Sequence, residues 1–133
     1  MLLKVRRSET SGRVRIPGSK SHTIRALFIA GLANGVSRII DPLVSEDALS
    51  AVNVCRSLGA DIQTMEEGFR VCGFDGMPKV PDDVVNVGNS GTTLRFALMT
   101  AGLSEGCTVF TGDHQIRRRP LGPLIEAMNS LGA

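Results

Sequence analysis

Residues 18–25 read GSKSHTIR and residues 88–95 read GNSGTTLR, and this pair of segments decides the fold. The two align without a gap, with glycine, threonine and arginine at matching positions. A later block, SLGA at residues 57–60, returns unchanged at residues 130–133. Because the blocks recur in the same order at nearly constant spacing, we interpret the chain as carrying a duplicated supersecondary unit.

The first copy predicts an α/β unit with the element order βαβαββ. Its second helix shows the pattern most clearly, because Leu49, Val52, Cys55 and Leu58 recur at helical spacing behind the capping residue Ser45. In chain order, the predicted elements are a strand at 14–16, a helix with the apolar face Ile24, Leu27, Phe28 and Leu32, a strand at 36–40, a helix from Ser45 to Gly59, and a hairpin of strands at 61–65 and 69–74.

The second copy predicts the same order but lacks the final hairpin. We expect a strand at 84–87, a helix at 92–103 and a strand at 107–111. A last helix is predicted to open at Pro120, since proline is favoured at a first helical position. The face of that helix is Leu121, Leu124, Ile125, Met128 and Leu131. We therefore expect part of a larger protein, with unit one at about 13–75 and an incomplete unit two at about 83–133.

Composition excludes several classes of function. The 133 residues are 42% hydrophobic and 21% charged, with a net charge of only +2, which suits one globular domain and not a binder of polyanions through bulk charge. Trp and Tyr are absent, so a surface that stacks nucleic-acid bases is not expected. No apolar run has the length of a membrane span. We expect a cytoplasmic protein with neither a nucleic acid nor a membrane as partner.

The three cysteines form no metal or disulfide pattern. Cys55, Cys72 and Cys107 are far apart, and no CxxC pair occurs. We expect three buried small hydrophobic residues and no metal site. His22 and His114 are interpreted as ordinary polar residues, because no cysteine or carboxylate stands at ligand spacing from them.

Each copy places a Gly/Ser-rich turn directly before a helix, and this arrangement is typical of anion sites. Backbone N–H groups and the positive end of the helix dipole point to one spot there. In the first copy Lys20, Ser21 and Arg25 can converge on one phosphate, and in the second copy the turn at 88–93 is followed by Arg95. The alternative for each turn is a tight connection between strand and helix.

Outside these turns, three further residues are candidates. Arg119 precedes the predicted helix start at Pro120, where a cation is misplaced unless an anion joins it. Asp47 and Asp113 could act as acid or base, although capping of a helix also explains Asp47.

Three blocks of residues resemble the enolpyruvyl transferases and span nearly the whole chain in family order. They are Pro17-Gly18-Ser19-Lys20-Ser21 with Arg25, Gly88-Asn89-Ser90-Gly91-Thr92 with Arg95, and Gly112-Asp113 followed by Arg117 and Arg119-Pro120-Leu121-Gly122. The resemblance implies an inside-out α/β barrel fold of two globules, each with three βαβαββ units around a pseudo-threefold axis. The chain then corresponds to about the first third, with its second unit truncated and residues 1–12 pairing with the second globule.

The resemblance also implies a reaction. It is the transfer of the carboxyvinyl group of phosphoenolpyruvate to the 5-hydroxyl of shikimate 3-phosphate, a step of aromatic amino acid biosynthesis. A tetrahedral intermediate forms, phosphate leaves, and neither a metal nor an organic cofactor takes part. The acid and base groups of the family, an Asp and a Glu, lie on the second globule. We therefore expect the 133 residues alone to be inactive, with weak self-association through the unpaired amino-terminal segment.

Site residues follow from the same resemblance. Lys20 resembles the lysine that contacts phosphoenolpyruvate and is the predicted catalytic residue. Ser21 and Arg25 resemble the pair that holds shikimate 3-phosphate. Arg119 resembles the arginine on the phosphoenolpyruvate anion.

The remaining candidates belong to the loop and the cleft of the family. Asn89 and Gly91 lie in the loop that faces phosphoenolpyruvate, Asp47 matches an acidic position near the cleft, and Thr92 and Arg95 are further candidates from the second block.

Two alternatives remain open. One is a phosphate-binding module that performs no chemistry. The other is a relative of the enzymes that act on UDP-N-acetylglucosamine, which carry a reactive cysteine in the loop equivalent to residues 112–120. This loop has no cysteine.

Overall fold

The structure, a computed structural model, describes residues 2–133 and divides them into helices and short strands. In chain order the elements are α1 (Lys20–Leu32), β1 (Val36–Ile40), α2 (Glu46–Ser57), β2 (Asp61–Met65), β3 (Gly68–Cys72), β4 (Val85–Asn86), α3 (Gly91–Ala101), β5 (Phe110–Thr111), the 3-10 turn η1 (Ile116–Arg118) and α4 (Gly122–Ser130). The predicted sequence of helices and strands from Lys20 onward is confirmed.

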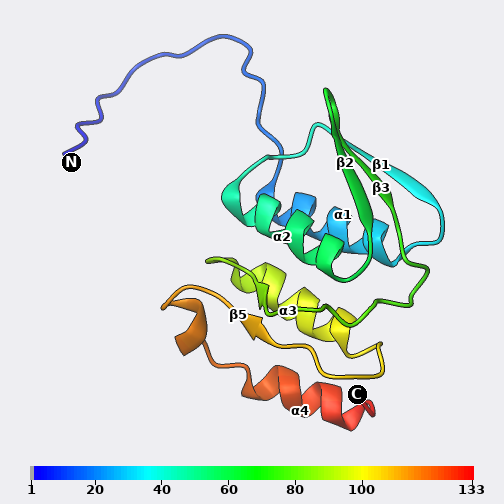
Figure 1. Cartoon of the computed structure of the whole chain (residues 1–133). Helices are drawn as coiled ribbons and strands as arrows, with labels where there is room; N and C mark the ends of the chain where they lie inside the picture. The colour runs from blue at the N-terminus through cyan, green and yellow to red at the C-terminus, as the bar shows by residue number, and fades with distance from the viewer. Residues whose placement is uncertain (1) are drawn as a thin grey trace.

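The first copy forms a three-stranded sheet covered by two helices. The strand order is β1-β3-β2, and both pairings are antiparallel. Ile62 lies opposite Val71 in the β2–β3 register, and both side chains are buried. The helices α1 and α2 lie side by side against the same face of the sheet (Figure 1). Along β3 the buried residues Phe69 and Val71 alternate with half-buried ones, as expected for a strand with one face on the core.

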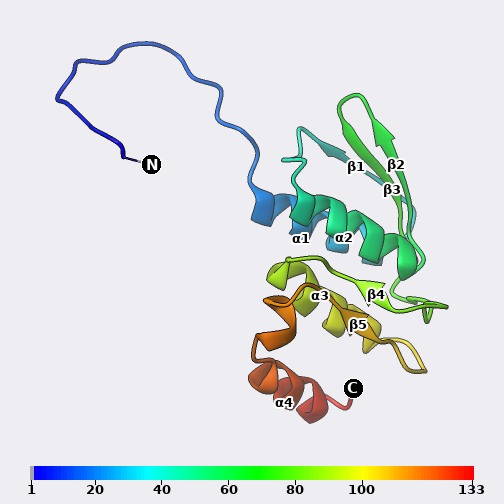
Figure 2. The same ribbon diagram turned by 60° about the vertical axis from the view of Figure 1, so that its left-hand side comes forward.

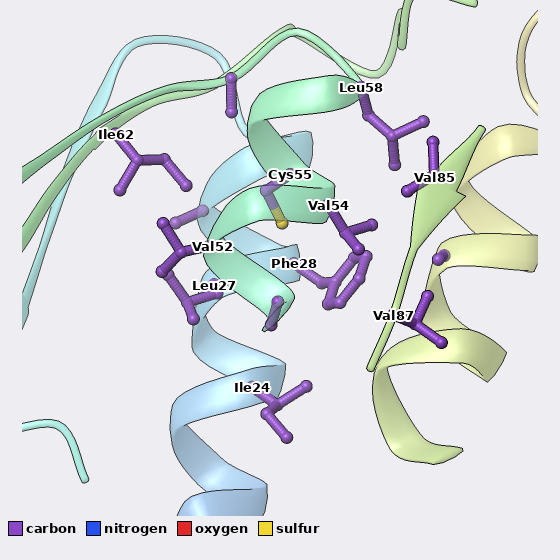
Figure 3. Packing of buried hydrophobic residues seen from close by; sticks show 14 of the residues in the cluster. Ile24, Leu27, Phe28, Val52, Val54, Cys55, Leu58, Ile62, Val85 and Val87 are labelled. Atoms are coloured by element: carbon purple, nitrogen blue, oxygen red, sulfur yellow. The ribbon is translucent and has the colours of Figure 1, made fainter. Parts of the chain in front are cut away.

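The core joins the two copies of the repeat. Ile24 and Leu27 of α1, Val54 of α2 and Val87, which follows β4, belong to one hydrophobic cluster, and all four are fully buried (Figure 3). Burying one such side chain contributes about 1.5–3 kcal/mol relative to leaving it in water. The second copy therefore packs on the outer side of the α1–α2 layer as part of a common core.

The second copy contains a parallel strand pair with a helical crossover. β4 pairs with β5 in parallel, with Val85 opposite Phe110, and α3 connects the two strands. Beyond them lies α4, at the edge of the molecule (Figure 2). The predicted apolar face of α4 is only partly covered. Leu121 packs against the core and Leu124 and Met128 are half-buried, whereas Ile125 and Leu131 are exposed, Leu131 to 87%.

The predicted strand at 14–16 is not formed. Val14 is 82% exposed and Ile16 is 79% exposed, and neither belongs to a strand. In the second copy the equivalent strand, β4, pairs with β5 in parallel. The corresponding partner in the first copy is β1, which pairs only with β3 among the described residues. An alternating apolar pattern is not sufficient for a strand when its backbone groups have no partner.

Several local predictions need correction. Helix α4 begins at Gly122 rather than at Pro120, and Pro123 lies in its first turn. Leu49 is 45% exposed, so it does not belong to the buried stripe of α2. Of the three cysteines only Cys55 is buried, while Cys72 is half-buried and Cys107 is exposed.

Three smaller observations complete the fold. All three cysteines are free. Within residues 2–133 no helix is both long enough and apolar enough to span a bilayer. In the same range no three His, Cys, Asp or Glu residues gather as metal ligands would.

Candidate anion-binding site

Three helices begin on the same side of the molecule. The first turns of α1, α2 and α3 lie at one end of the helical layers, together with η1 (Figures 1 and 2). Each helix has a serine at its N-cap, and the hydroxyls of Ser19, Ser45 and Ser90 accept from the backbone N–H groups of His22, Ala48 and Thr93. Positive helix ends that lie near one another favour an anion there.

Lys20 and Asp47 form an ion pair between the first turns of α1 and α2. The Lys20 ammonium lies 2.7 Å from the Asp47 carboxylate, and the side chains are 50% and 24% exposed. The backbone oxygen of Asp47 accepts from the Thr93 hydroxyl at 3.4 Å. Asp47 therefore connects the three helix starts. Ser45 performs the capping of α2, so the carboxylate of Asp47 is used to hold Lys20.

Two guanidinium groups lie over Gly91, the first residue of α3. A Cβ atom built on Gly91 would lie 2.7 Å from Nη1 of Arg119 and 3.2 Å from Nη1 of Arg95. Arg95 also donates to the backbone oxygen of Gly91 at 3.1 Å. Within residues 2–133 neither arginine forms an ion pair with a carboxylate. Two unneutralised cations in one place indicate a site for an anion.

The loop that carries Arg119 is fixed by Asp113 and Ile116. The Asp113 carboxylate accepts from the backbone N–H groups of Gln115 and Ile116 at 2.9 Å each, and the Ile116 side chain is 3% exposed. The Asp113 N–H donates to the backbone oxygen of Gly88 at 2.9 Å. Asp113 thus closes a local turn and ties the Arg119 loop to the Gly88 turn. This is a structural use of a residue that the sequence also presented as a candidate acid or base.

Arg25 lies one turn into α1 and faces back toward the start of the helix. Its Nη1 donates to the backbone oxygen of Ser21 at 3.0 Å, and its guanidinium carbon lies 5.9 Å from the centroid of the Phe96 ring. Arg25 is exposed, Ser21 is half-buried, and no carboxylate within residues 2–133 pairs with Arg25.

The other predicted residues have simpler surroundings. Asn89 is exposed and Thr92 is half-buried, and both stand in the turn before or at the start of α3. His22 and His114 are exposed. The three blocks of the sequence pattern, at residues 17–25, 88–95 and 112–122, lie together at one end of the molecule.

Thr93 and Phe96 are not among the predicted site residues. Thr93 is fully buried and shares a hydrogen bond of 2.8 Å with the Ser90 hydroxyl. A signal for Thr93 was available, because threonine recurs in both copies. Thr23, its counterpart, accepts from the backbone N–H of Leu43 at 3.0 Å. In each copy the buried threonine ties a helix start to the neighbouring segment.

Comparison with known proteins gives consistent matches across the chain. A family model described as EPSP synthase (3-phosphoshikimate 1-carboxyvinyltransferase) matches residues 5–133. The 3-phosphoshikimate 1-carboxyvinyltransferase of Acetivibrio thermocellus is 68% identical over 133 residues, which are 100% of this chain and 31% of that protein. The protein of the same name from Ruminiclostridium cellulolyticum is 58% identical over 132 residues, 99% of this chain and 31% of that protein.

A solved structure agrees with the sequence matches. EPSP synthase from Acinetobacter baumannii superposes with a TM-score of 0.81 at 28% identity, covering 92% of this chain and 28% of that chain. The chain spans about 31% of the length of the curated relatives it matches. The α/β fold expected from the resemblance is confirmed. The chain belongs to the EPSP synthase (3-phosphoshikimate 1-carboxyvinyltransferase) family.

Proposed function

We propose that this chain takes part in transferring the carboxyvinyl group of phosphoenolpyruvate to the 5-hydroxyl of shikimate 3-phosphate, as the part of the enzyme that holds both anions. The observation that carries the proposal is the pair of guanidiniums, Arg95 and Arg119, over Gly91, beside the helix starts that also hold Lys20. Family membership and the names of the relatives support the same reaction.

The two anions are assigned to different copies of the repeat. Arg25 and Ser21 hold shikimate 3-phosphate at the start of α1, where the guanidinium already faces. Arg119 and the turn containing Asn89 and Gly91 hold phosphoenolpyruvate at the start of α3. Charge-assisted hydrogen bonds of this kind are about twice as strong as neutral ones.

Lys20 and Arg95 complete the phosphoenolpyruvate subsite, and Thr92 is a further donor at the start of α3. In the proposed reaction the 5-hydroxyl gives up its proton to a base, its oxygen bonds to C2 of phosphoenolpyruvate, and C3 gains a proton from an acid. The bond from C2 to the phosphate oxygen then breaks, C3 loses a proton to a base, and inorganic phosphate leaves. Lys20, held by Asp47 at 2.7 Å, places a positive charge beside the departing phosphate. The scheme involves no change of oxidation state and uses no cofactor.

Further groups must come from outside residues 1–133. The scheme requires an acid and a base for the protons of the 5-hydroxyl and of C3, and we assign them to the second globule of the enzyme. That globule is the proposed protein partner, and the segment 1–12 is the proposed contact with it. We place the reaction in the cytoplasm, where both phosphorylated substrates are metabolites.

A second candidate is phosphate binding without chemistry by these residues alone. It is favoured by the openness of the site, because the Lys20 side chain is 50% exposed and Arg25 is exposed. An anion held on an open surface is screened by water and salt, so the dissociation constant of the 133 residues is expected in the range of about millimolar.

A chimera separates the two candidates. The first 133 residues of the Acetivibrio thermocellus relative are replaced by this chain, and phosphate release from the two substrates is measured. We expect the chimera to turn over and residues 1–133 alone to bind without turnover. Arg119→Ala in the chimera is expected to remove most activity, whereas Arg118→Ala is the matched control. A folded chimera that binds both substrates and releases no phosphate would support binding without chemistry.

A further inference from the structure

The β1-β3-β2 sheet has one face that no described element covers. Helices α1 and α2 lie on the other face, and within residues 2–133 no helix or strand lies over this one (Figures 1 and 2). Because Phe69 and Val71 of β3 are buried against the helices, the alternate residues of the strands point to the uncovered side. We call this side the outer face. The register arranges its residues in three rows across the sheet, Val36-Cys72-Asp61, Arg38-Arg70-Gln63 and Ile40-Gly68-Met65.

The middle row of the outer face sets two arginines side by side. Arg38 and Arg70 are directly opposite in the β1–β3 register, a position in which like charges repel. Arg38 lies 3.6 Å from the Glu67 carboxylate of its own chain. Within residues 2–133 neither Arg70 nor Glu66 forms an ion pair. This face therefore carries a cation in its middle row and an anion at the tip of the β2–β3 hairpin, each without a counter-charge in the described part of the chain.

The last row of the outer face is apolar and hollowed. Ile40 and Met65 are exposed side chains on either side of Gly68, and they border a hollow of about 220 Å³. The backbone fixes this opening, because the oxygen of Ile39 leaves no room for a Cβ atom at Gly68. Glu66 stands at the rim of the hollow. A hollowed apolar row with charges of both signs beside it is a surface that a protein partner can cover.

A second copy of the chain fits the outer face by symmetry. A twofold axis that runs across the strands makes each row face the position at an equal distance on the other side of the axis. With the axis over the Ile40-Gly68-Met65 row, this row meets itself. Arg70 lies two residues after Gly68 and Glu66 lies two residues before it. The axis therefore brings Arg70 of each copy to Glu66 of the other, so that each unpaired charge meets its counter-charge.

We propose that the outer face is a self-association surface, on which two copies of this chain pack face to face with Arg70 of each paired to Glu66 of the other. None of these residues belongs to the candidate anion-binding site, so the proposal stands apart from the proposed function. Strands about 4.8 Å apart with about 3.3 Å per residue give the face an area of roughly 240 Å². A stable interface buries about 800 Å² on each partner. The pair is therefore weak and transient, with an expected dissociation constant of about 0.1–1 mM.

Two charge-reversed variants of the 133-residue chain test the proposal, Arg70→Glu and Glu66→Arg. In either variant alone both contacts across the axis join like charges, so self-association is expected to weaken about tenfold. In an equimolar mixture of the two variants both contacts again join opposite charges, and the mixed pair is expected to form with about the parent affinity. An ion pair within one chain cannot produce this recovery, because each chain carries only one of the two changes.

Sedimentation equilibrium up to about 1 mM protein measures the association, and thermal unfolding checks that both variants fold. When isotope-labelled Arg70→Glu is mixed with unlabelled Glu66→Arg, the amide NMR shifts are expected to change along β1, β2 and β3. Arg118→Glu and Glu126→Arg are the matched controls, since they reverse exposed charges away from the sheet and give their mixture the same difference in net charge. Each control is expected to associate as the parent does, alone and mixed.

Recovery of association in the mixture, with shifts confined to the sheet, supports the proposal. It is overturned if the parent chain stays monomeric over this range of concentration, or if the mixture of Arg70→Glu and Glu66→Arg associates no more than its components do. Association that is unchanged in both variants would come from another surface, such as residues 1–12, and would equally exclude the outer face.

Discussion

Arg25 and Arg95 make the same hydrogen bond in the two copies of the repeat. Each donates Nη1 to the backbone oxygen of the residue four positions earlier, Ser21 at 3.0 Å and Gly91 at 3.1 Å. Side chains in helices lean toward the amino end, so each guanidinium is brought to the positive start of its own helix. A cation in that position is electrostatically unfavourable without an anion. Each copy of the repeat therefore holds an arginine at the start of a helix, where an anion is favoured.

The first prediction concerns Arg95→Lys. Lysine keeps the charge, but a single ammonium cannot both bond to the backbone oxygen of Gly91 and present a planar fork to an anion. We expect affinity for phosphoenolpyruvate to fall about tenfold, the size of one lost charge-assisted hydrogen bond. Arg117→Lys, on an exposed arginine, is the control. Equal affinities of parent and Arg95→Lys in isothermal titration would exclude Arg95 from the site.

The second prediction concerns the space over Gly91. In Gly91→Ala the new Cβ meets Nη1 of Arg119 at 2.7 Å, and the guanidinium must move away. Both neighbouring groups are the far ends of flexible side chains, so stability should change by less than about 1 kcal/mol, while phosphoenolpyruvate binding weakens. Gly122→Ala is the matched control, because Gly122 also begins a helix and has open space around its Cβ position. Parent-like binding by Gly91→Ala would contradict the role assigned to this contact.

Much of the architecture can be predicted from the sequence because it depends on neighbouring residues. The strand β1 and the helix α2 with its cap Ser45 were predicted from periodicity and capping, which are properties of short segments. The strand predicted at 14–16 does not form, because a strand needs a neighbouring strand to accept and donate its backbone hydrogen bonds. The surface position of Cys107 was missed for a related reason, because only two residues of the segment around it, Phe110 and Thr111, form a strand.

The candidate site was predictable in its parts and not in its geometry. The glycine, serine and arginine pattern indicates anion binding at each turn. Nothing in that pattern places Asp47 beside Lys20 or Phe96 beneath Arg25, because these contacts join residues that are far apart in the sequence. They depend on how the two copies pack together.

The third prediction is a dependence of stability on pH. Burial raises the pKa of the Cys55 thiol from 9.0 to about 12. Between these values the unfolded chain has lost the proton and the folded chain has kept it, so the free energy of unfolding falls as pH rises above about 9. The slope from this group is about 1.4 kcal/mol per pH unit. Urea unfolding at several pH values should show that Cys55→Ala lacks this slope, and an identical slope in parent and variant would contradict the assignment.

The fourth prediction concerns the amino-terminal segment. Within residues 2–133 no backbone hydrogen bond links residues 2–18 to the rest of the chain, and the segment extends away from the helices (Figure 1). In a dilute monomeric sample we expect fast amide hydrogen exchange from Leu2 to Arg7. Protection that develops only as concentration rises would indicate strand pairing between chains. Strong protection in the dilute monomer would show that the segment docks on its own chain.

The turn from Asp113 to Arg119 depends on very few residues. Ile116 supplies its buried anchor and Asp113 its internal hydrogen bonds, whereas α4, which follows it, buries no residue. A polar substitution at Ile116 would therefore displace the arginine from a distance, although Ile116 itself touches no ligand. The position of the Arg119 charge is thus inherited through an apolar side chain three residues earlier in the sequence.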